Sequence, residues 1–167
     1  DFRNLLPKIS GIWVDGTFGF GGYSNCLLEA GVEKLIVIDV DPDVKQHINN
    51  LQTKWPSKID FYISNFNEIK NILKNLEIKH IDGVLLDIGV SSMQLDKSLR
   101  GFSFKHDGPL DMRMSRNGPT ASDFINNAEE NLIAEVIYKY GEESKAKIIA
   151  KRIVESRKKS KIDTTYK

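Results

Sequence analysis

Short apolar runs alternate with amphipathic stretches along the first half of the chain. The runs are rich in β-branched residues and have the length of strands buried on both faces. They predict four strands, at 12–14, 35–39, 59–64 and 82–87. The stretches between them repeat hydrophobic residues at helical spacing and predict three helices: one that ends at Gly31, one over 42–51 capped by Asp41, and one over 67–76 capped by Asn67.

This alternation predicts an α/β, doubly wound, Rossmann-like fold. Short strand–helix units force a parallel sheet with right-handed crossovers, and the expected strand order is 3-2-1-4. Ligands of such folds bind beyond the carboxyl ends of the strands. Asp15, Asp39, Phe66 and Asp87 all follow strand ends, so we expect these four residues at one edge of the sheet.

The loop after the first strand is rich in glycine, with Gly16, Gly19, Gly21 and Gly22 falling within seven residues. Glycine lets the backbone turn and brings its N–H groups close to a ligand, and the following helix N-terminus favours negative charge. Dinucleotide-binding folds have a similar loop, so the loop alone leaves a nicotinamide cofactor open. The carboxylate of Asp15 favours a ligand with an ammonium group, such as S-adenosylmethionine.

Two further residues fit a nucleoside ligand. Asp39 stands twenty residues after Gly19, the spacing at which a carboxylate ending the second strand binds ribose hydroxyls. Asp41, followed by Pro42, is the better helix cap, which leaves Asp39 for the ribose. Phe66 is suited to pack against an adenine, although a lone aromatic residue is more often part of a core.

The pattern changes after the fourth strand. Residues 88–121 lose all periodicity but keep apolar residues between their charges, which predicts an ordered active-site loop. Helices follow: Asn127 and Glu130 resemble a capping box, an apolar stripe runs to Tyr140, and Gly141 ends that helix. A second stripe covers 146–154, with Lys151 and Arg152 on its flank.

Composition bounds the function. The chain has 167 residues, 40% apolar and 28% charged, as expected for one domain with an appendage. Its single cysteine, Cys26, excludes an internal disulfide and a multi-cysteine zinc site. No apolar run is long enough to span a membrane, so we expect a cytoplasmic protein. Residues 145–167 carry a net charge of +7, which suits RNA, and the missing initial methionine suggests a fragment.

Three blocks of the sequence resemble a known family. They are Asp15-Gly-Thr-Phe-Gly-Phe-Gly-Gly-Tyr-Ser24, Leu85-Leu-Asp-Ile-Gly-Val-Ser-Ser-Met-Gln-Leu-Asp96 and Arg100-Gly-Phe-Ser-Phe-Lys-His-Asp-Gly-Pro-Leu-Asp-Met-Arg-Met114. The chain resembles an N-terminal portion of the ribosomal small-subunit RNA methyltransferase H family, also called MraW. The family has His at position 23 and Pro at position 93, where this chain has Tyr and Met.

The resemblance implies an S-adenosylmethionine-dependent enzyme that methylates N4 of a cytidine in the decoding region of 16S rRNA, with the small ribosomal subunit as its partner. It implies a methyltransferase domain over 1–121 and the start of a helical substrate-binding insertion over 122–167. The cofactor contacts carried over are Gly21, Gly22, Tyr23, Asp39, Phe66, Asp87 and Gln94.

Transfer to an amine requires an acceptor for its proton near the end of the fourth strand. Asp87 is our first candidate, with the Ile88 carbonyl and Ser91 beside it and Asp111 as a reserve. Arg100 and Arg113 are suited to hold phosphates or stack on a base, and Lys151 and Arg152 to bind the RNA backbone. We expect no metal.

Three rival functions remain. One is a non-catalytic RNA-binding or ribosome-assembly module, and a second is a metal-dependent hydrolase that would use Asp87, Asp96, Asp107 and Asp111 as oxygen ligands. The third is an oxidoreductase. We also expect the fourth strand to form an exposed edge that invites a homodimer, and a fragment of this length to methylate rRNA poorly by itself.

Overall fold

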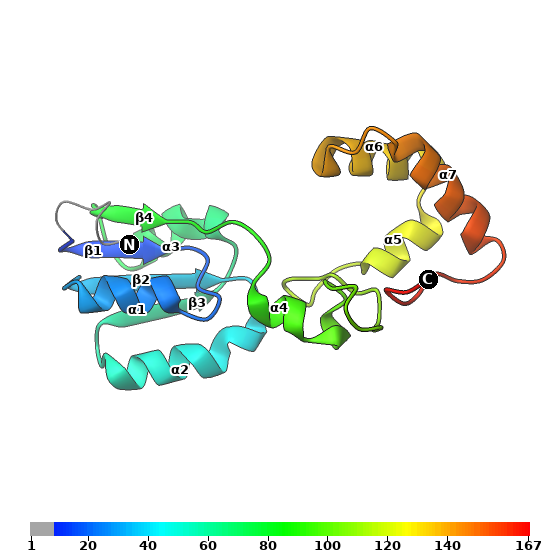
Figure 1. Cartoon of the computed structure of the whole chain (residues 1–167). Helices are drawn as coiled ribbons and strands as arrows, with labels where there is room; N and C mark the ends of the chain where they lie inside the picture. The colour runs from blue at the N-terminus through cyan, green and yellow to red at the C-terminus, as the bar shows by residue number, and fades with distance from the viewer. Residues whose placement is uncertain (1–8) are drawn as a thin grey trace. The chain divides into compact units, whose positions relative to one another are not determined.

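The computed structural model describes residues 9–167 and divides into two compact units, with the boundary between Met93 and Gln94. The first unit contains β1 (Ile12–Asp15), α1 (Gly22–Glu29), β2 (Lys34–Asp39), η2 (Pro42–Val44), α2 (Lys45–Lys54), β3 (Ile59–Ile63), η3 (Phe66–Glu68), α3 (Ile69–Asn75) and β4 (Gly83–Leu85) (Figure 1). Helix α4 (Ser92–Asp96) spans the boundary. The second unit contains η4 (Ser98–Arg100), α5 (Ala121–Asn127), α6 (Glu130–Gly141) and α7 (Ala146–Arg157).

The four strands form a parallel sheet in the order β3-β2-β1-β4. The predicted α/β class and strand order are therefore confirmed. The strands lie close to their predicted positions, although β4 is shorter than the apolar run 82–87. Asp82 is outside the strand, where its carboxylate accepts the Ile12 N–H at 2.7 Å.

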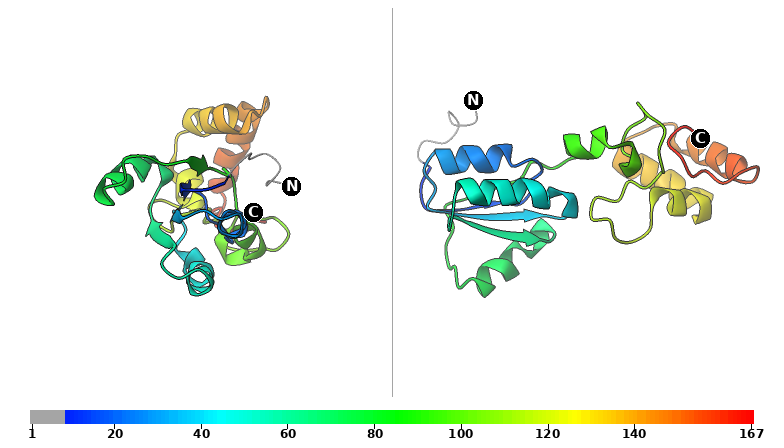
Figure 2. Two further views of the ribbon diagram at one scale, coloured as in Figure 1. Left: turned by 90° about the vertical axis from the view of Figure 1, so that its left-hand side faces the viewer. Right: turned by 90° about the horizontal axis from the view of Figure 1, so that it is seen from below.

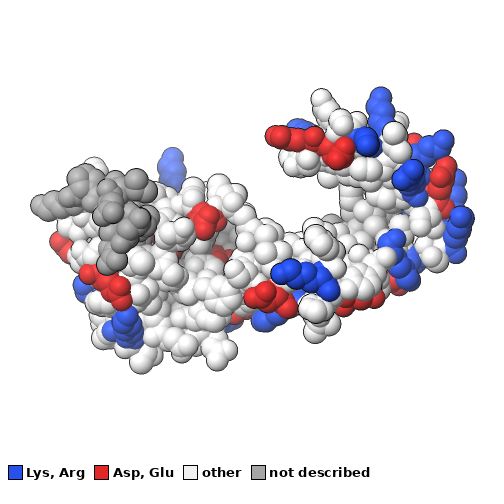
Figure 3. Space-filling model, viewed as in Figure 1, with Lys and Arg blue, Asp and Glu red and all other residues white. Residues whose placement is uncertain are grey.

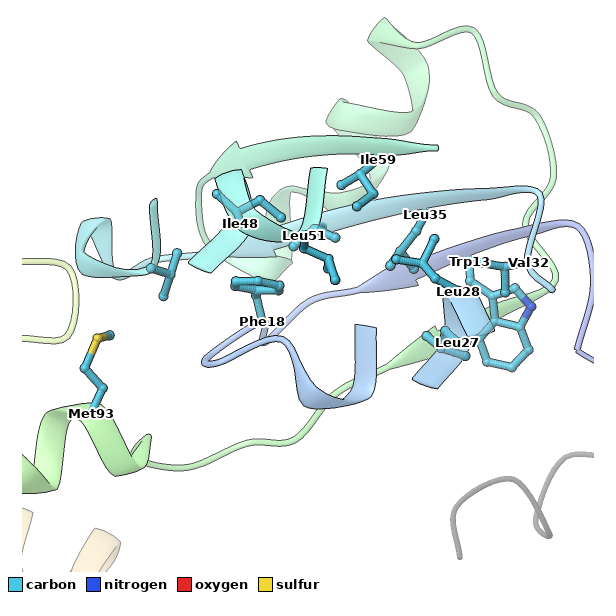
Figure 4. Packing of buried hydrophobic residues seen from close by; sticks show 12 residues of the cluster. Trp13, Phe18, Leu27, Leu28, Val32, Leu35, Ile48, Leu51, Ile59 and Met93 are labelled. Carbon is cyan, nitrogen blue, oxygen red and sulfur yellow. The ribbon is translucent and has the colours of Figure 1, made fainter. Parts of the chain in front are cut away.

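Alternate residues of the central strands point to opposite faces of the sheet, as the strand period of two requires. Trp13, Leu35 and Val37 pack under α1 and α2, in a cluster that includes Leu27 and Ile48 (Figure 4). On the opposite face, three strand residues pack against Ile72 of α3: Val14, Ile36 and Ile38. Figure 2 shows these helices on the two sides of the sheet. Burial on both faces explains the continuous apolar runs in the sequence.

The two helices that follow β2 and β3 each begin with a side-chain cap. Asp41 accepts the Asp43 N–H at 3.0 Å and Pro42 follows it, so the predicted cap is confirmed. The prediction for the next helix was wrong: Asn65, and not Asn67, is the cap, and it accepts the Asn67 N–H at 3.0 Å. Both helices open with a 3₁₀ turn before α2 and α3 begin.

The second unit is built on an α6–α7 hairpin. Ile133, Ala134 and Ala150 form its core, and Phe124 of α5 and the following Ala128 pack against them. Arg157 donates to the carbonyls of Ile125 and Ala128, which satisfies acceptors at the end of α5. Part of the predicted apolar stripes therefore lies where the helices meet, whereas Leu132 and Tyr140 of the first stripe are 47% and 75% exposed.

One predicted helix signal in this unit was wrong, and a second was confirmed. The capping box lies at Thr120 and Asp123, where it starts α5, a helix that the sequence analysis missed. Asn127 ends α5, and α6 begins after Glu129 with no side-chain cap. Gly141 is the last residue of α6, as predicted, and Glu142 after it takes the left-handed conformation that is usual for a glycine.

The packing boundary also lies earlier than the predicted domain boundary at residue 121. The N–H of Leu110 donates to the Asp163 carbonyl, Pro109 bridges to Thr164, and the buried Ser122 hydroxyl donates to the Ile162 carbonyl. These bonds join much of the loop 88–121 to the segment that follows α7. Most of that loop therefore belongs to the helical unit and not to the sheet unit.

Candidate functional site

The carboxyl ends of the strands lie at one edge of the sheet. Asp15 pairs with Val37 in β2 and with Leu85 in β4, and Asp39 pairs with Ile63 in β3. The connections that leave this edge are the glycine loop, the residues after β2, the turn that contains η3, and the segment after β4. This is the position at which parallel α/β sheets bind ligands.

The glycine loop leads into a helix N-terminus without a side-chain cap. Gly21 is the N-cap of α1, with φ 77°, and a Cβ there would lie 2.5 Å from the Phe18 ring. A Cβ on Gly22, in contrast, would meet no atom within 4 Å. Gly22 and Tyr23 are exposed, and no side chain caps the N-terminus of α1, which is a position that favours an anionic group.

Asp15 does not face a ligand, which corrects the interpretation of this residue. It is fully buried; its Oδ1 accepts the Thr17 N–H at 3.1 Å and its Oδ2 accepts the Ser24 hydroxyl at 2.6 Å. Burial raises the pKa of Asp15 to about 6. The carboxylate therefore organises the glycine loop. Thr17 and Ser24 had no predicted role, although hydroxyl residues two and nine positions after a strand-end acid were a visible signal.

Asp39 is half-buried and supports the same loop. Its Oδ2 accepts the Gly19 N–H at 2.8 Å, and its Oδ1 accepts the Asp41 N–H at 2.9 Å. Burial raises the pKa of Asp39 above its ordinary value. Each carboxylate oxygen can accept more than one hydrogen bond, so the side chain retains capacity for a ribose hydroxyl.

Phe66 and Asp87 lie on the two other connections at this edge. A Cβ on Gly16 would lie 3.1 Å from the Phe66 Cβ and 2.5 Å from Leu86 Cδ2, so the absence of a side chain there lets both neighbours approach the loop. Asp87 is exposed, and its N–H donates to the Thr17 hydroxyl at 2.7 Å. The first unit thus brings together six of the seven predicted cofactor residues at one edge.

Gln94, the seventh, lies in α4 on the other side of the unit boundary, and its side chain is buried. Its contact with a cofactor therefore rests on the family resemblance alone. Across residues 9–167, no group of three or more His, Cys, Asp or Glu side chains is placed to hold a metal ion. None of the helices described is long and apolar enough to cross a membrane.

Asp111 and Arg113 were predicted for proton transfer and RNA, but they bind each other. Asp111 Oδ1 accepts from Arg113 Nε at 3.0 Å, and its Oδ2 accepts from a terminal guanidinium nitrogen at 2.7 Å. Hydrogen bonding to Arg113 lowers the pKa of Asp111, which makes it a poorer proton acceptor. Arg113 also donates to the Gly118 carbonyl at 3.1 Å. The pair closes a turn.

Arg100 is fully buried, which contradicts its predicted contact with RNA. Its guanidinium donates to the carbonyls of Arg113 and Met114 at 2.9 and 3.1 Å and lies 5.8 Å from the centre of the Phe102 ring. A buried guanidinium cannot reach a phosphate in this conformation. Arg100 instead joins two parts of its own loop.

Lys151 and Arg152 remain accessible. Both are exposed on α7, and Figure 3 shows Lys and Arg side chains gathered over this helix and the residues after it. Nine Lys and Arg side chains stand against two acids over 145–167. The second unit therefore presents a group of positive charges on a regular helix, in contrast to the buried Arg100 of the loop.

The sheet order, the glycine loop after β1 and the carboxylates at the ends of β2 and β4 define a Rossmann-like domain of the class that binds nucleotide-type cofactors. Residues 2–167 match the model of the MraW methylase family, and the chain belongs to this family. It is similar to the Ribosomal RNA small subunit methyltransferase H of Rickettsia felis, with 50% identity over 164 residues, 98% of this chain and 53% of that protein. The protein of the same name from a Wolbachia of Drosophila simulans is 48% identical over 163 residues, 97% of this chain and 56% of the relative. The chain spans about half the length of these relatives.

Proposed function

We propose that this chain carries the cofactor-binding part of an S-adenosylmethionine-dependent rRNA methyltransferase. The observation that carries the proposal is the uncapped N-terminus of α1 beside a glycine loop, at the edge where Asp39 also lies. Family membership and the printed names of the relatives support methyl transfer to ribosomal RNA. The finer assignment is N4 of a cytidine in the decoding region of 16S rRNA, in the cytoplasm.

The residues at the sheet edge fit the parts of this cofactor. The N-terminus of α1, at Gly22 and Tyr23, suits its carboxylate because a helix N-terminus favours negative charge and no side chain caps this one. Asp39 suits the ribose hydroxyls, and the half-buried Phe66 suits the adenine. We include Gln94 among the proposed cofactor contacts on the basis of the family resemblance. When bound, the cofactor supplies an electrophilic methyl group, and the protein has to hold the acceptor amine in line with it.

Asp87 is the acceptor that we propose for the N–H of the target amine. The lone pair of a cytosine amine is delocalised into the ring, so a hydrogen-bond acceptor is needed to orient the group. Asp87 is exposed at the sheet edge, whereas Asp111 is paired with Arg113 and has a lowered pKa. This contrast favours Asp87 over Asp111. The Ile88 carbonyl and Ser91 are on the segment that follows.

The substrate that we propose is the small ribosomal subunit or its 16S rRNA. The exposed cations of α7, among them Lys151 and Arg152, are suited to the RNA backbone. The same cations also favour the second candidate function, a non-catalytic RNA-binding module. The two candidates differ in whether the sheet edge binds S-adenosylmethionine.

We further propose self-association through β4, which is the end strand of the described sheet. Val84 and Leu86 are 45% and 43% exposed there. Apolar edge strands with open backbone groups pair with other chains. Light scattering of the isolated 167 residues over a range of concentrations should show dimers at high concentration, and a monomer throughout would contradict the pairing.

The test of the function is incubation of the full-length protein with labelled S-adenosylmethionine and under-methylated small subunits. The expected product is N4-methylcytidine in 16S rRNA, identified after nuclease digestion. RNA binding without cofactor binding or label transfer would support the non-catalytic module instead. In a parallel assay we expect the isolated 167 residues to transfer little methyl, and robust transfer by them would contradict that expectation.

A further inference from the structure

The pairing between β1 and β4 ends in an irregular hydrogen bond. The Gly16 N–H donates to the Leu85 carbonyl at 3.0 Å, as in a regular parallel ladder. The next bond of such a ladder would run from the Asp87 N–H to the Gly16 carbonyl. The Asp87 N–H donates instead to the Thr17 hydroxyl at 2.7 Å. A side chain therefore holds the backbone at the point where the segment after β4 leaves the sheet.

The Thr17 hydroxyl is itself fixed in place. The Thr17 N–H donates to Asp15 Oδ1, and the other oxygen of Asp15 accepts the Ser24 hydroxyl from the first turn of α1. Asp15 and Ser24 are both fully buried. Since Thr17 is also β-branched, its side chain has few rotamers. The end of β1, the start of α1 and the backbone of Asp87 thus share one hydrogen-bonded network.

The residues after Thr17 are tied to a different strand. The Phe18 N–H donates to the Ile38 carbonyl at 3.3 Å, and the Gly19 N–H donates to Asp39. Thr17 is therefore the point at which the glycine loop changes its attachment from β4 to β2. Movement of its hydroxyl would shift Asp87 without moving Asp39.

We propose that Thr17 is a positioning residue for methyl transfer, which acts by holding Asp87 and the start of the segment that follows. The inference rests on the proposed function, because it takes Asp87 as the residue that orients the acceptor amine. Thr17 need not touch the cofactor or the substrate. Its loss should slow transfer more than it weakens cofactor binding, because Asp39 and the α1 N-terminus keep their own supports.

Two substitutions in the full-length protein test this role. Thr17→Val keeps the shape of the side chain and removes the hydroxyl, whereas Thr17→Ser keeps the hydroxyl. Asp87 is exposed, so water can replace the lost acceptor and both variants should fold. For Thr17→Val we expect kcat to fall about tenfold or more, because small misplacements of a reacting group cost up to about a hundredfold in rate. The dissociation constant of S-adenosylhomocysteine should change less than about threefold, and Thr17→Ser should restore most of kcat.

Amide hydrogen exchange gives a readout that needs neither cofactor nor RNA. Loss of one hydrogen bond should speed exchange at the Asp87 N–H about five- to tenfold in Thr17→Val, with Thr17→Ser close to wild type. Unchanged exchange, unchanged kcat, or equal loss of kcat in both variants would overturn the proposal. If the wild type neither binds cofactor nor transfers methyl, the proposed function fails, and with it the role of Thr17 in transfer. The exchange at Asp87 then decides separately whether Thr17 positions the backbone.

Discussion

The glycine loop 16–21 and the loop that contains Arg100 and Arg113 are each organised around one buried charge of opposite sign. Asp15 accepts hydrogen bonds from Thr17 and Ser24, and Arg100 donates to two backbone carbonyls of its own loop. Sequence patterns assigned both charges to ligands. In the structure both serve the protein backbone, because an irregular segment has many backbone groups without secondary-structure partners.

The groups that we propose as ligand contacts differ between the two regions. In the glycine loop they are backbone N–H groups at the start of α1, which a charged side chain does not reveal. In the second unit they are Lys151 and Arg152, on a regular helix whose own backbone is satisfied. In both loops, therefore, the charge that the sequence pattern singled out makes hydrogen bonds within the protein itself.

The largest effect should follow from Arg100→Met, which removes the buried cation of the second region. It leaves the half-buried carbonyls of Arg113 and Met114 without their donor, and an acceptor left unsatisfied away from water costs about 1 to 3 kcal/mol. We expect the free energy of unfolding to fall by about 4 kcal/mol in urea titrations of the full-length protein. Lys105→Met, at an exposed position of the same loop, should change it by less than about 0.5 kcal/mol. If the free energy of unfolding is unchanged and RNA binding is lost, Arg100 contacts the RNA and does not stabilise its loop.

The next effect is a pH dependence carried by Asp15. Burial raises its pKa from the ordinary 3.8 to about 6, so between these values the folded state holds a proton that the unfolded state has lost. The free energy of unfolding therefore includes a contribution from protonated Asp15 below pH 4. This contribution, about 3 kcal/mol, is lost as the pH rises to about 6.

Asp15→Asn removes this titration and keeps an acceptor for the Thr17 N–H. The difference in unfolding free energy between variant and wild type should shift by about 3 kcal/mol in favour of the variant between pH 4 and pH 7. Urea titrations at a series of pH values measure it. Parallel pH profiles for the two proteins would show that Asp15 titrates normally.

Asp39→Ala tests the ligand side of the glycine loop. Loss of a charge-assisted contact to the ribose should cost about 1.5 to 3 kcal/mol, or roughly ten- to a hundredfold in the affinity for S-adenosylhomocysteine. Calorimetry measures the effect. Asp60→Ala is a matched control, because Asp60 lies on β3 away from the sheet edge and pairs with Lys34. If both variants bind like wild type, Asp39 has no role in holding the ribose.

The smallest effect is expected for Lys151→Glu combined with Arg152→Glu. Two lost phosphate contacts should weaken RNA binding about tenfold and reduce the salt slope of the affinity by roughly two. Lys70→Glu with Lys74→Glu, at exposed positions of α3, is the control for net charge. Equal losses in the two double variants would mean that α7 acts only through the net charge of the protein.

Much of the fold was predictable because the first unit buries both faces of its sheet. The apolar runs at β1 and β2, the cap at Asp41 and the strand order follow from rules of local pattern and chain connection. The start of α5 could not be predicted from the sequence, because its capping box at Thr120 lies in a segment without apolar periodicity. Glu142 took the left-handed position after α6, which the rule assigns to a glycine.

The location of the candidate site could be predicted from the sequence, but the hydrogen-bond partners of its residues could not. Strand ends identified Asp39, Phe66 and Asp87, whose arrangement at one edge follows from parallel strand order. The inward orientation of Asp15 depends on Ser24, nine residues away on another element. Such a partner depends on tertiary geometry, which spacing along the chain does not contain.

The most direct test of the account is a titration of ¹⁵N-labelled full-length protein with S-adenosylhomocysteine, followed by backbone amide NMR. We predict saturable shifts at the amides of the glycine loop and the first turn of α1, with further shifts at Asp39 and Asp87. The amides of α6 and α7 should move little. Saturation without any change between Gly19 and Tyr23 would contradict the assignment of this edge as the cofactor site.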